Sequence, residues 1–225
     1  MNLSVVIPTL NAAARLPATL AAFADTDEII IADSGSNDGT VALAAASGAR
    51  AIATAPGRGH QLIAGARAAR NAWLLFLHAD TVIEPGWRDE VERFMALPEH
   101  AKVAATFRFA LDDDSPSARR LEAVVAWRVR WFGLAYGDQG LLIHRDFYAA
   151  LGGFRPWPLM EDVDFVRRIG RRRLLVLRAA ARTSAERWRQ DGWRRRSARN
   201  VGCLALYFAG VPPHIIRRLY GWPWL

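Results

Sequence analysis

The sequence predicts an α/β protein with a mainly parallel central sheet flanked by helices. Short apolar runs typical of buried strands alternate with Ala- and Leu-rich segments typical of helices. This alternation implies β-α-β units, whose right-handed crossovers bring the carboxyl ends of neighbouring strands to one edge of the sheet. Acidic loops at Asp33 and Asp80 follow two such strands. Because ligands of open α/β sheets bind at that edge, both loops are expected to face one crevice.

The first half of the chain carries the strands and helices on which this prediction depends. Its apolar runs predict strands at residues 3–7, 28–32, 51–53 and 73–77, with Pro8 ending the first one. The run at 73–77 indicates a strand buried on both faces of the sheet. Helices are expected between these strands, from after Asn11 to about Ala24, at 41–47 with Gly48 as the cap, and from Gly57 to about Arg70.

The second half alternates less regularly. Helices are expected at residues 85–97, 116–132 and 163–169 and a half-exposed strand at 103–110, while the short apolar run at 141–143 receives no assignment. In the 116–132 helix, four apolar residues at helical spacing indicate a face packed on the core: Leu121, Val125, Val129 and Phe132. Residues 112–114 are three consecutive aspartates, which we interpret as a solvated turn rather than a metal cluster because Ser115-Pro116 follows.

Composition bounds the class of protein. A chain of 225 residues that is 52% hydrophobic can bury one substantial core, so we expect one domain with an appendage. No apolar run reaches the roughly 18 residues that span a bilayer. Residues 1–4 lack the basic start and apolar stretch of a signal peptide. With Cys203 as the single cysteine there is no disulfide framework, and we therefore expect a cytoplasmic protein.

The charge of the chain is strongly asymmetric. The formal net charge is +8, yet residues 1–166 carry 15 basic and 20 acidic side chains, and residues 167–225 carry 15 basic and 2 acidic ones. A basic tail behind an acidic body favours an anionic partner: a membrane surface, a phosphorylated substrate or a nucleic acid. The alternative is that the arginines are solvated side chains of ordinary helices.

Two common nucleotide-binding signatures are absent from the sequence. No Gly-x-Gly-x-x-Gly follows the first strand, and no Walker loop occurs anywhere in the chain. The sequence therefore argues against a dinucleotide enzyme and against a P-loop NTPase.

Four motifs, in order, resemble those of family-2 glycosyltransferases, which have the GT-A (Rossmann-like) fold. They are residues 5–11 (VVIPTLN), residues 33–40 (DSGSNDGT), His78-Ala79-Asp80 at the place of the family's metal-binding Asp-x-Asp, and Gly152-Gly153-Phe154 followed by Glu161-Asp162. The resemblance covers most of residues 3–170. It implies a donor that is a nucleotide-diphosphate sugar, with a UDP-sugar as first choice, and a divalent cation, Mn²⁺ or Mg²⁺.

The resemblance also implies roles for individual residues. Asp162 would be the catalytic base, and Glu161 would position the acceptor or the base. Asp80, with His78, would hold the metal. Asp138 and Gln139 are candidate contacts to the hydroxyl acceptor, with a simple turn as the alternative. The predicted nucleotide-sugar contacts are Pro8, Thr9, Asn11, Asp33, Ser34, Arg58, Gln61, His78 and Ala79.

Two residues depart from the family pattern. Ser34 replaces the second aspartate of the nucleotide signature, which weakens the expectation of a uracil base. His78 replaces the first acid of Asp-x-Asp, and a neutral imidazole can bind Mn²⁺ but suits Mg²⁺ poorly. Asp80 can equally be a cap or turn residue, and the acids at 161 and 162 can cap the following helix.

The chemistry of sugar transfer explains why acidic residues are needed. The leaving diphosphate builds negative charge that a bridging cation stabilises, which is the role expected of Asp80. The acceptor hydroxyl loses a proton as it attacks, and in an inverting displacement a carboxylate on the opposite face takes it, which is the role expected of Asp162. Repulsion between the neighbouring carboxylates of Glu161 and Asp162 would raise the proton affinity of one of them.

Further motifs refine the prediction. Residues 57–61 (GRGHQ), 76–81 (FLHADT) and 137–140 (GDQG) resemble a small bacterial subgroup named for arsenosugar biosynthesis and associated with radical-SAM proteins. A Gln-x-x-Arg-Trp motif of processive synthases is not convincingly present, so transfer of a single sugar is expected. We predict a domain at 1–180, with a nucleotide-sugar half at 1–110 and an acceptor half at 111–180, and a basic helical extension at 181–225.

Two other function classes compete with sugar transfer. A nucleotidyltransferase also uses a parallel sheet and acidic metal loops, but no Gly-rich, Lys-containing loop follows the first strand. The other is a non-catalytic module that uses the Arg-rich tail to bind an anionic membrane or nucleic acid, with nucleic acid the less expected partner. The tail is also expected to dock the enzyme itself on the inner face of an anionic cell membrane, with Trp188, Trp193, Trp222 and Trp224 at the lipid boundary and residues 201–209 in the interface. The alternative is that these helices pack on the sheet with the tryptophans in the core.

Overall fold

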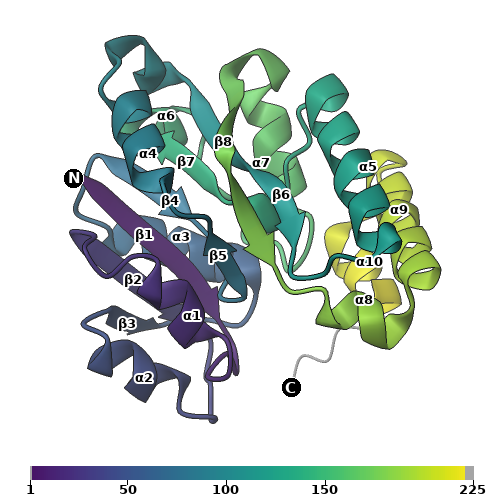
Figure 1. Ribbon diagram of the computed structural model, residues 1–225, viewed down its shortest axis with the longest axis horizontal. Helices are drawn as coiled ribbons and strands as arrows, with labels where there is room; N and C mark the ends of the chain where they lie inside the picture. Colours follow the sequence, from purple (N-terminus) through teal and green to yellow (C-terminus); the bar gives the residue numbers. More distant parts are fainter. Residues whose placement is uncertain (1, 221–225) are drawn as a thin grey trace.

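The computed structural model describes residues 2–220 of the chain. Within them, a single eight-stranded sheet has the order β3-β2-β1-β4-β7-β6-β8-β5 (Figure 1). The strands are β1 (Leu3–Thr9), β2 (Glu28–Asp33), β3 (Arg50–Ala53), β4 (Trp73–Phe76), β5 (Thr81–Ile83), β6 (Ala104–Leu111), β7 (Leu141–His144) and β8 (Leu174–Thr183).

Helices cover both faces of the sheet. They are α1 (Leu16–Ala21), α2 (Thr40–Ala46), α3 (Arg58–Ala68), α4 (Trp87–Met95), α5 (Pro116–Phe132), α6 (Arg145–Ala150), α7 (Glu161–Ile169), α8 (Glu186–Asp191), α9 (Trp193–Phe208) and α10 (Pro213–Tyr220), with 3-10 turns η1 (Pro98–Lys102), η2 (Gly137–Gln139) and η3 (Arg171–Arg173). Alternate residues of each central strand feed the two cores: Val6 and Leu74 pack with α3, α5 and α7, whereas Val5 and Leu75 pack with α1 and α4.

The sheet is mixed, which corrects the predicted mainly parallel sheet. Strands β3, β2, β1 and β4 are parallel to one another, as expected from the β-α-β pattern. Strand β7 is antiparallel to both β4 and β6, and β5 is antiparallel to β8. A short apolar run such as residues 141–143 carries no information on strand direction, which is set by the neighbours it pairs with.

Strand β1 continues through Pro8 to Thr9, whereas the sequence predicted that Pro8 would end it. Pro8 is in register with Ala32 of β2. Its nitrogen faces the β4 side of the strand, where the ladder stops opposite Val6 and the last hydrogen bond runs from Leu77 N to Val6 O. No ladder donor is required at that position, so the proline is tolerated.

Helix α5 has the predicted limits, but its apolar face is only partly core. Val125 and Val129 are buried, as expected, whereas Phe132 is exposed, which corrects its assignment to the core. Helix α1 is shorter than predicted and begins beside Pro17, where a missing N–H costs nothing.

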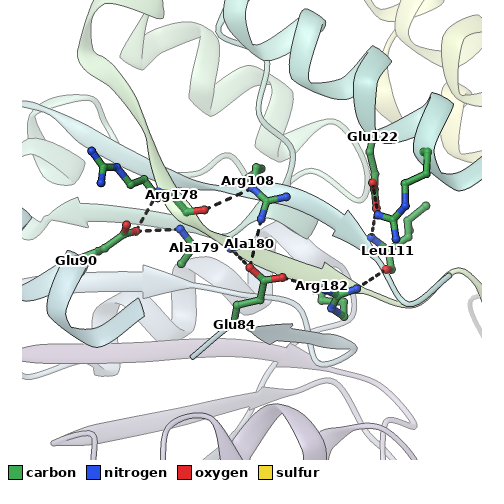
Figure 2. Close-up of polar contacts among 10 residues, drawn as sticks. Glu84, Glu90, Arg108, Leu111, Glu122, Arg178, Ala179, Ala180 and Arg182 are labelled. Carbon is green, nitrogen blue, oxygen red and sulfur yellow. Dashed lines mark hydrogen bonds and ion pairs between the residues drawn. The ribbon is translucent and has the colours of Figure 1, made fainter. Parts of the chain in front are cut away.

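Three strands, β5, β7 and β8, were not predicted. Strand β8 pairs with β6 and β5, and its register with β6 shifts between Thr106 and Arg108, which marks a bulge in β8. The Glu90 carboxylate accepts hydrogen bonds from the bulged N–H groups of Arg178 and Ala179, both at 3.0 Å (Figure 2). The Glu90 side chain of α4 therefore pairs with the backbone donors that the bulge leaves without a strand partner.

Glu84, directly after β5, contacts the same strand. Its carboxylate accepts hydrogen bonds from Ala180 N at 3.1 Å and from the Arg108 and Arg182 guanidiniums at 3.3 and 2.9 Å (Figure 2). Basic residues that the sequence suggested for an anionic partner thus belong in part to the sheet itself. Among residues 2–220, no helix is long and apolar enough to cross a membrane.

The aspartates at 112–114 form a turn that anchors the basic segment. Asp112 accepts a hydrogen bond from Ala185 N at 2.6 Å, and Asp113 accepts one from the Arg189 guanidinium at 2.9 Å. Asp112 and Asp113 therefore contribute hydrogen bonds that hold the start of α8 against the end of β6.

Candidate functional site

The loops after β1, β2 and β4 open at one edge of the sheet, as the sequence predicted. These strands are parallel neighbours, so Thr9, Asp33 and Phe76 all end at that edge. The first two loops are tied together: Ser36 Oγ accepts a hydrogen bond from Asn11 N at 2.8 Å, and Asn11 Oδ1 accepts one from Asn37 N at 3.0 Å. Asn11 adopts a left-handed backbone, φ 51°. The edge is thus a fixed scaffold rather than two independent loops.

Asp33 organises this scaffold. Its carboxylate accepts hydrogen bonds from Thr9 Oγ1 at 2.8 Å, Gly35 N at 2.9 Å, and Ser36 N and Oγ at 2.8 and 2.5 Å. Although burial alone would raise the pKa of Asp33, these donors lower it below its ordinary value. Thr9 therefore lies beside Asp33, as expected, and Ser34 N donates to the Thr9 carbonyl at 3.1 Å.

A cavity at this edge, which we call the strand-end pocket, has a volume of about 230 Å³. It gathers seven of the nine predicted nucleotide-sugar contacts, all except Asp33 and Ser34. It also gathers Arg15, Ser184 and two residues of α8 that the sequence did not suggest, Glu186 and Arg187. The predicted residues that line it are Pro8, Thr9, Asn11, Arg58, Gln61, His78 and Ala79, with Asp80 beside them.

Gln61 reaches this pocket from α3, but its amide is hydrogen-bonded to the main chain of β1 and β2. Its Nε2 donates to the carbonyls of Thr9 and Ala32, at 2.7 and 2.8 Å, and the side chain is 3% exposed. It thereby joins the ends of β1 and β2. In this arrangement the amide is a support for the pocket floor.

A second cavity, the central pocket, adjoins the first and has a volume of about 140 Å³. It contains Asp162 from α7 and Asp138 from η2. The two pockets share five lining residues, so they meet along a common wall: Arg58, His78, Asp80, Ser184 and Arg187. Asp80 and Asp162, which lie 82 positions apart in the sequence, are brought to one continuous cavity.

Asp162 is held by main-chain donors. Its Oδ2 accepts a hydrogen bond from Gly137 N at 2.9 Å, and its Oδ1 accepts one from Val163 N at 2.7 Å. The second bond lies in the first turn of α7, where three acids face the helix N-terminus. The N-cap of α7 is Met160, without a side-chain cap hydrogen bond, so Asp162 is a first-turn acid and a pocket carboxylate rather than the cap.

Asp138 is a third carboxylate of the central pocket, beside Asp80 and Asp162. Its Oδ1 is buried and has no hydrogen-bond partner among the described residues. Burial raises its pKa to about 6, Arg128 opposes that rise, and Asp162 and Asp80 add to it. By contrast, Gln139 is not among the described residues that line the pocket, because its Nε2 donates to the Phe107 carbonyl at 3.1 Å within the sheet.

Glu161 lies beneath the site. Its side chain is completely buried, and its Oε1 is 3.5 Å from Arg58 Nε. Burial raises the pKa of Glu161 to about 7 even though the Arg58 charge opposes the rise. Arg58 begins α3 next to Gly59, where a Cβ would come within 2.2 Å of the Arg155 carbonyl oxygen. Glycine at 59 therefore lets the start of α3 approach the segment that precedes α7.

The residues that could hold a metal here are Asp80 and, less directly, His78. His78 Nε2 lies so close to Gly137 that a Cβ there would be 2.4 Å from it. Burial, together with the charges of Arg58 and Arg187, holds the pKa of His78 well below its ordinary value, so the ring is neutral. One carboxylate suits a cation that keeps water and takes its other oxygens from substrate phosphates. The residues therefore fit a metal that arrives with a diphosphate, not a preformed cage.

Arg187 and Tyr136 are pocket residues that the sequence did not identify. Arg187 comes from α8 in the basic segment and lines both pockets. Tyr136 precedes η2, with the Arg128 guanidinium carbon 3.5 Å from its ring centroid. Only the excess of arginines in residues 167–225 hinted at such a role, and it did not single out one of them.

Family comparison now decides what kind of protein carries these pockets. The profile of the family described as glycosyl transferase family 2 matches residues 4–157, more than half of the chain. The chain belongs to glycosyl transferase family 2. Membership of this family favours sugar transfer over the nucleotidyltransferase and the non-catalytic module.

Solved structures of glycosyltransferases have a similar fold. Residues 1–349 of TarS from S. aureus align with a TM-score of 0.63 at 15% identity, covering 82% of this chain and 61% of that one. Glucosyl-3-phosphoglycerate synthase from Mycobacterium tuberculosis aligns with a TM-score of 0.61 at 22% identity, covering 93% of this chain and 80% of that one. The chain thus spans less than two thirds of the TarS fragment. The shared architecture is the GT-A fold, here with a mixed sheet flanked by helices.

The ligands in these crystals belong to the neighbours themselves. The mycobacterial synthase was solved with Mn²⁺, UDP and glucosyl-3-phosphoglycerate. TarS was solved with UDP-GlcNAc. That TarS structure aligns with a TM-score of 0.62 at 16% identity, covering 82% of this chain and 58% of that one. At these identities the likeness concerns the fold.

The tryptophans predicted to contact a membrane are arranged differently from that expectation. Trp188 and Trp193 are partly buried and stack with ring centroids 6.4 Å apart, and the Arg196 guanidinium lies over Trp188. Trp222 and Trp224 lie outside the described residues. Residues 201–209 belong mostly to α9, where Cys203 is buried. The predicted domain boundary between 180 and 181 falls inside β8.

Proposed function

We propose that this family-2 glycosyltransferase transfers a single sugar from a nucleotide-diphosphate sugar, with UDP as the first-choice nucleotide, to a hydroxyl acceptor with inversion. The observation that carries the proposal is the common wall of the two pockets. A diphosphate at Asp80, Arg58 and Arg187 would place the nucleoside in the strand-end pocket and the sugar toward Asp162 in the central pocket. The UDP and UDP-GlcNAc complexes of the structural neighbours support this choice of donor.

Binding of the donor would use the remaining residues of the strand-end pocket. Pro8, Thr9 and Asn11 line the wall on which the nucleoside would lie. Asp33 and Ser34 would act by holding that wall, since the Asp33 carboxylate already accepts four hydrogen bonds from the chain. Ser34 in place of a second aspartate leaves the base to be established by comparing UDP- with other nucleotide-linked sugars.

Negative charge on the leaving diphosphate would be balanced from two sides. Asp80 would hold a divalent cation, Mn²⁺ or Mg²⁺, with the His78 ring nitrogen that does not face Gly137 as the second candidate ligand. When bound, the cation supplies positive charge to the diphosphate oxygens. Arg58 and Arg187 would supply positive charge directly as hydrogen-bond donors. The planar donor fork of a guanidinium group matches the geometry of phosphate oxygens.

Proton transfer from the acceptor hydroxyl would fall to a carboxylate of the central pocket. We assign it to Asp162, with Asp138 contacting the acceptor and Glu161 holding Arg58 in place from below. The two main-chain N–H groups that donate to Asp162 keep its carboxylate oriented. Orientation of this kind is what general base catalysis requires.

Hydrolysis of a panel of nucleotide sugars, with Mn²⁺, with Mg²⁺ and with EDTA, tests the proposal. Slow release of nucleoside diphosphate from one donor, lost in Asp80→Asn, is the expected result. If no nucleotide sugar is bound or cleaved under any of these conditions, the assignment of the strand-end pocket to a donor is wrong.

Three broader expectations remain part of the proposal. Residues 57–61, 76–81 and 137–140 support membership of the arsenosugar-biosynthesis subgroup, and transfer to a synthetic arsenosugar precursor tests it. The division at 180 into a catalytic domain and a basic helical extension is tested by limited proteolysis. We place the enzyme in the cytoplasm, with attachment to the inner face of the cell membrane as the variant that fractionation of cells tests.

A further inference from the structure

A third cavity opens off the central pocket between α5 and α9, which lie side by side at the right of Figure 1. We call it the α5–α9 groove, and its volume is about 380 Å³, the largest of the three cavities described here. It shares five lining residues with the central pocket, so the two are continuous: Tyr136, Asp138, Trp188, Asn200 and Leu204. A molecule whose reactive end lies in the central pocket can extend the rest of its length into this groove.

The walls of the groove are largely apolar and partly open to solvent. Leu121 and Val124 contribute from α5, and Val201 and Leu204 contribute from α9. Val124 is 59% exposed and Val201 is 65% exposed, although both are valines in the middle of long helices. Exposed apolar side chains that gather at a cavity mark a binding site for an apolar ligand.

The outer surface of α5 extends this apolar face. Trp127 and Trp131 are 56% and 55% exposed. Trp127 follows Val124 by three residues and Trp131 follows Trp127 by four, which places all three on one side of the helix. Exposed tryptophans of this kind settle at the boundary between lipid and water. The face beside the groove therefore suits a membrane surface.

The charged residues of the groove are mainly cationic, and its uncharged polar residues include Ser117, Ser197 and Asn200. Arg120, Arg128 and Arg194 line it, and Asp138 is the single acidic residue among its described lining residues. Arg128 is fixed at the inner end, where its Nε donates to the Leu134 carbonyl at 2.9 Å and its guanidinium lies over Tyr136. An apolar channel with arginines along it complements a ligand that has an apolar chain and an anionic group.

We propose that the α5–α9 groove binds the apolar chain of an anionic lipid drawn from a membrane surface, and that this lipid carries the acceptor hydroxyl. The inference rests on the proposed function, because it names the acceptor class of the same site. Apolar contact with α5 and α9 holds the chain, and the arginines hold the acidic group. The hydroxyl then lies in the central pocket, next to Asp138 and Asp162.

Binding of alkyl phosphates, measured by titration calorimetry below their micellar concentrations, tests the groove without requiring turnover. Each buried methylene strengthens binding by up to about fourfold. We therefore expect octyl phosphate to bind at least about tenfold more tightly than butyl phosphate, and more tightly than octyltrimethylammonium. Equal affinity for the two phosphates, or tighter binding of the cation, would overturn the proposal.

Variants localise the binding. Val124→Asp and Val201→Asp place a carboxylate in the groove at positions exposed enough for the fold to persist, and each should weaken octyl phosphate by about tenfold or more. The matched control is Val41→Asp on α2, an exposed valine on a helix distant from the groove, which should bind as the parent does. Equal weakening in the control, or no weakening in the groove variants, contradicts the proposal.

The source of the ligand is tested with vesicles. Vesicles of phosphatidylcholine with phosphatidylglycerol should sediment the enzyme, pure phosphatidylcholine should sediment much less, and Trp127→Ser with Trp131→Ser should reduce sedimentation severalfold. Failure to bind the anionic vesicles would overturn a membrane source. Octyl phosphate binding that occurs only in a variant ending at Tyr220 would assign the groove to residues 221–225 instead.

The acceptor class and the donor assignment can be overturned independently of each other. A normal rate of nucleotide-sugar hydrolysis combined with no dependence on alkyl chain length would overturn the acceptor class and leave the proposed function standing. Octyl phosphate binding with no nucleotide-sugar hydrolysis would support the groove and reject the donor assignment. A dimer that octyl phosphate dissociates would identify the groove as a contact between two copies and overturn the proposal.

Discussion

Glu161 Oε1 lies 3.5 Å from Arg58 Nε, with the glutamate side chain completely inaccessible to solvent. The pair joins the first residue of α7 to the first residue of α3, so it connects the two helices that carry the catalytic and the diphosphate candidates. Removing a carboxylate from water costs free energy that one partially aligned guanidinium does not fully return. This explains why the pKa of Glu161 rises to about 7 despite the ion pair.

The raised pKa predicts a dependence of stability on pH. Because the folded state binds the Glu161 proton more tightly than the unfolded state does, the contribution of this group is complete below its ordinary pKa of 4.5 and is lost as pH rises to about 7. Over that window we expect the free energy of unfolding to fall by about 3 kcal/mol from this group. Urea unfolding at several pH values should show the fall in the parent and a flatter profile in Glu161→Gln. An identical slope in both proteins would contradict the assignment.

Asp162→Asn should separate chemistry from donor binding. The asparagine oxygen can still accept the Gly137 N–H, so η2 should stay in place, but the amide cannot take a proton. We expect turnover to fall by about 10²–10⁴ while the donor dissociation constant changes by less than about threefold. Calorimetry with donor and steady-state kinetics measure the two quantities, with exposed Asp146→Asn as the control. A large loss of donor affinity in this variant would show that Asp162 contacts the nucleotide sugar and is not the base.

Asp80→Asn should remove the effect of metal on donor binding. Since the described residues offer no group of three metal ligands, we expect Mn²⁺ to bind measurably only when UDP is present. In the parent, Mn²⁺ should tighten UDP binding by about tenfold or more, and in Asp80→Asn that gain should vanish with the melting temperature unchanged. Asp114→Asn, in an exposed turn, is the control. Undiminished Mn²⁺-dependent turnover in Asp80→Asn would show that the metal binds elsewhere.

Arg187→Gln should weaken binding of the diphosphate. Hydrogen bonds to charged groups contribute about 1.5–3 kcal/mol, so we expect the dissociation constant for UDP to rise by about tenfold or more. Arg195→Gln removes an exposed arginine of α9 that lines none of the three pockets, and it should bind UDP normally. If both variants bind UDP equally well, Arg187 is only a surface residue. If both are equally weakened, net charge rather than position decides the affinity.

Glu90→Ala should destabilise the fold without affecting donor affinity. The substitution leaves the N–H groups of Arg178 and Ala179 without their carboxylate partner in the β8 bulge. Because water can reach part of this region, we expect a loss of about 1–2 kcal/mol in the free energy of unfolding. Glu92→Ala, an exposed residue of the same helix, should lose less than about 0.5 kcal/mol. Denaturant unfolding of the two variants provides the comparison.

The sequence predicts well those features that depend on neighbouring residues. Strands β1 to β4 and the helices between them follow from short apolar runs and cap residues, and parallel crossovers bring the loops after β1, β2 and β4 to one edge. Pro8 was misjudged because a strand can continue past a proline where the next strand has ended. Phe132 was misjudged because helical spacing identifies a face but not what covers it.

The remaining features depend on contacts between distant segments. The antiparallel direction of β7, the bulge in β8 and the place of Arg187 in the pocket wall are settled by pairing and packing across 30 to more than 100 residues. The sequence determined which chemical groups the site contains, because its motifs name Asp80, Asp162 and Arg58. Only the tertiary structure decided which of them are buried, paired or adjacent, because burial and proximity arise from the packing of the whole chain.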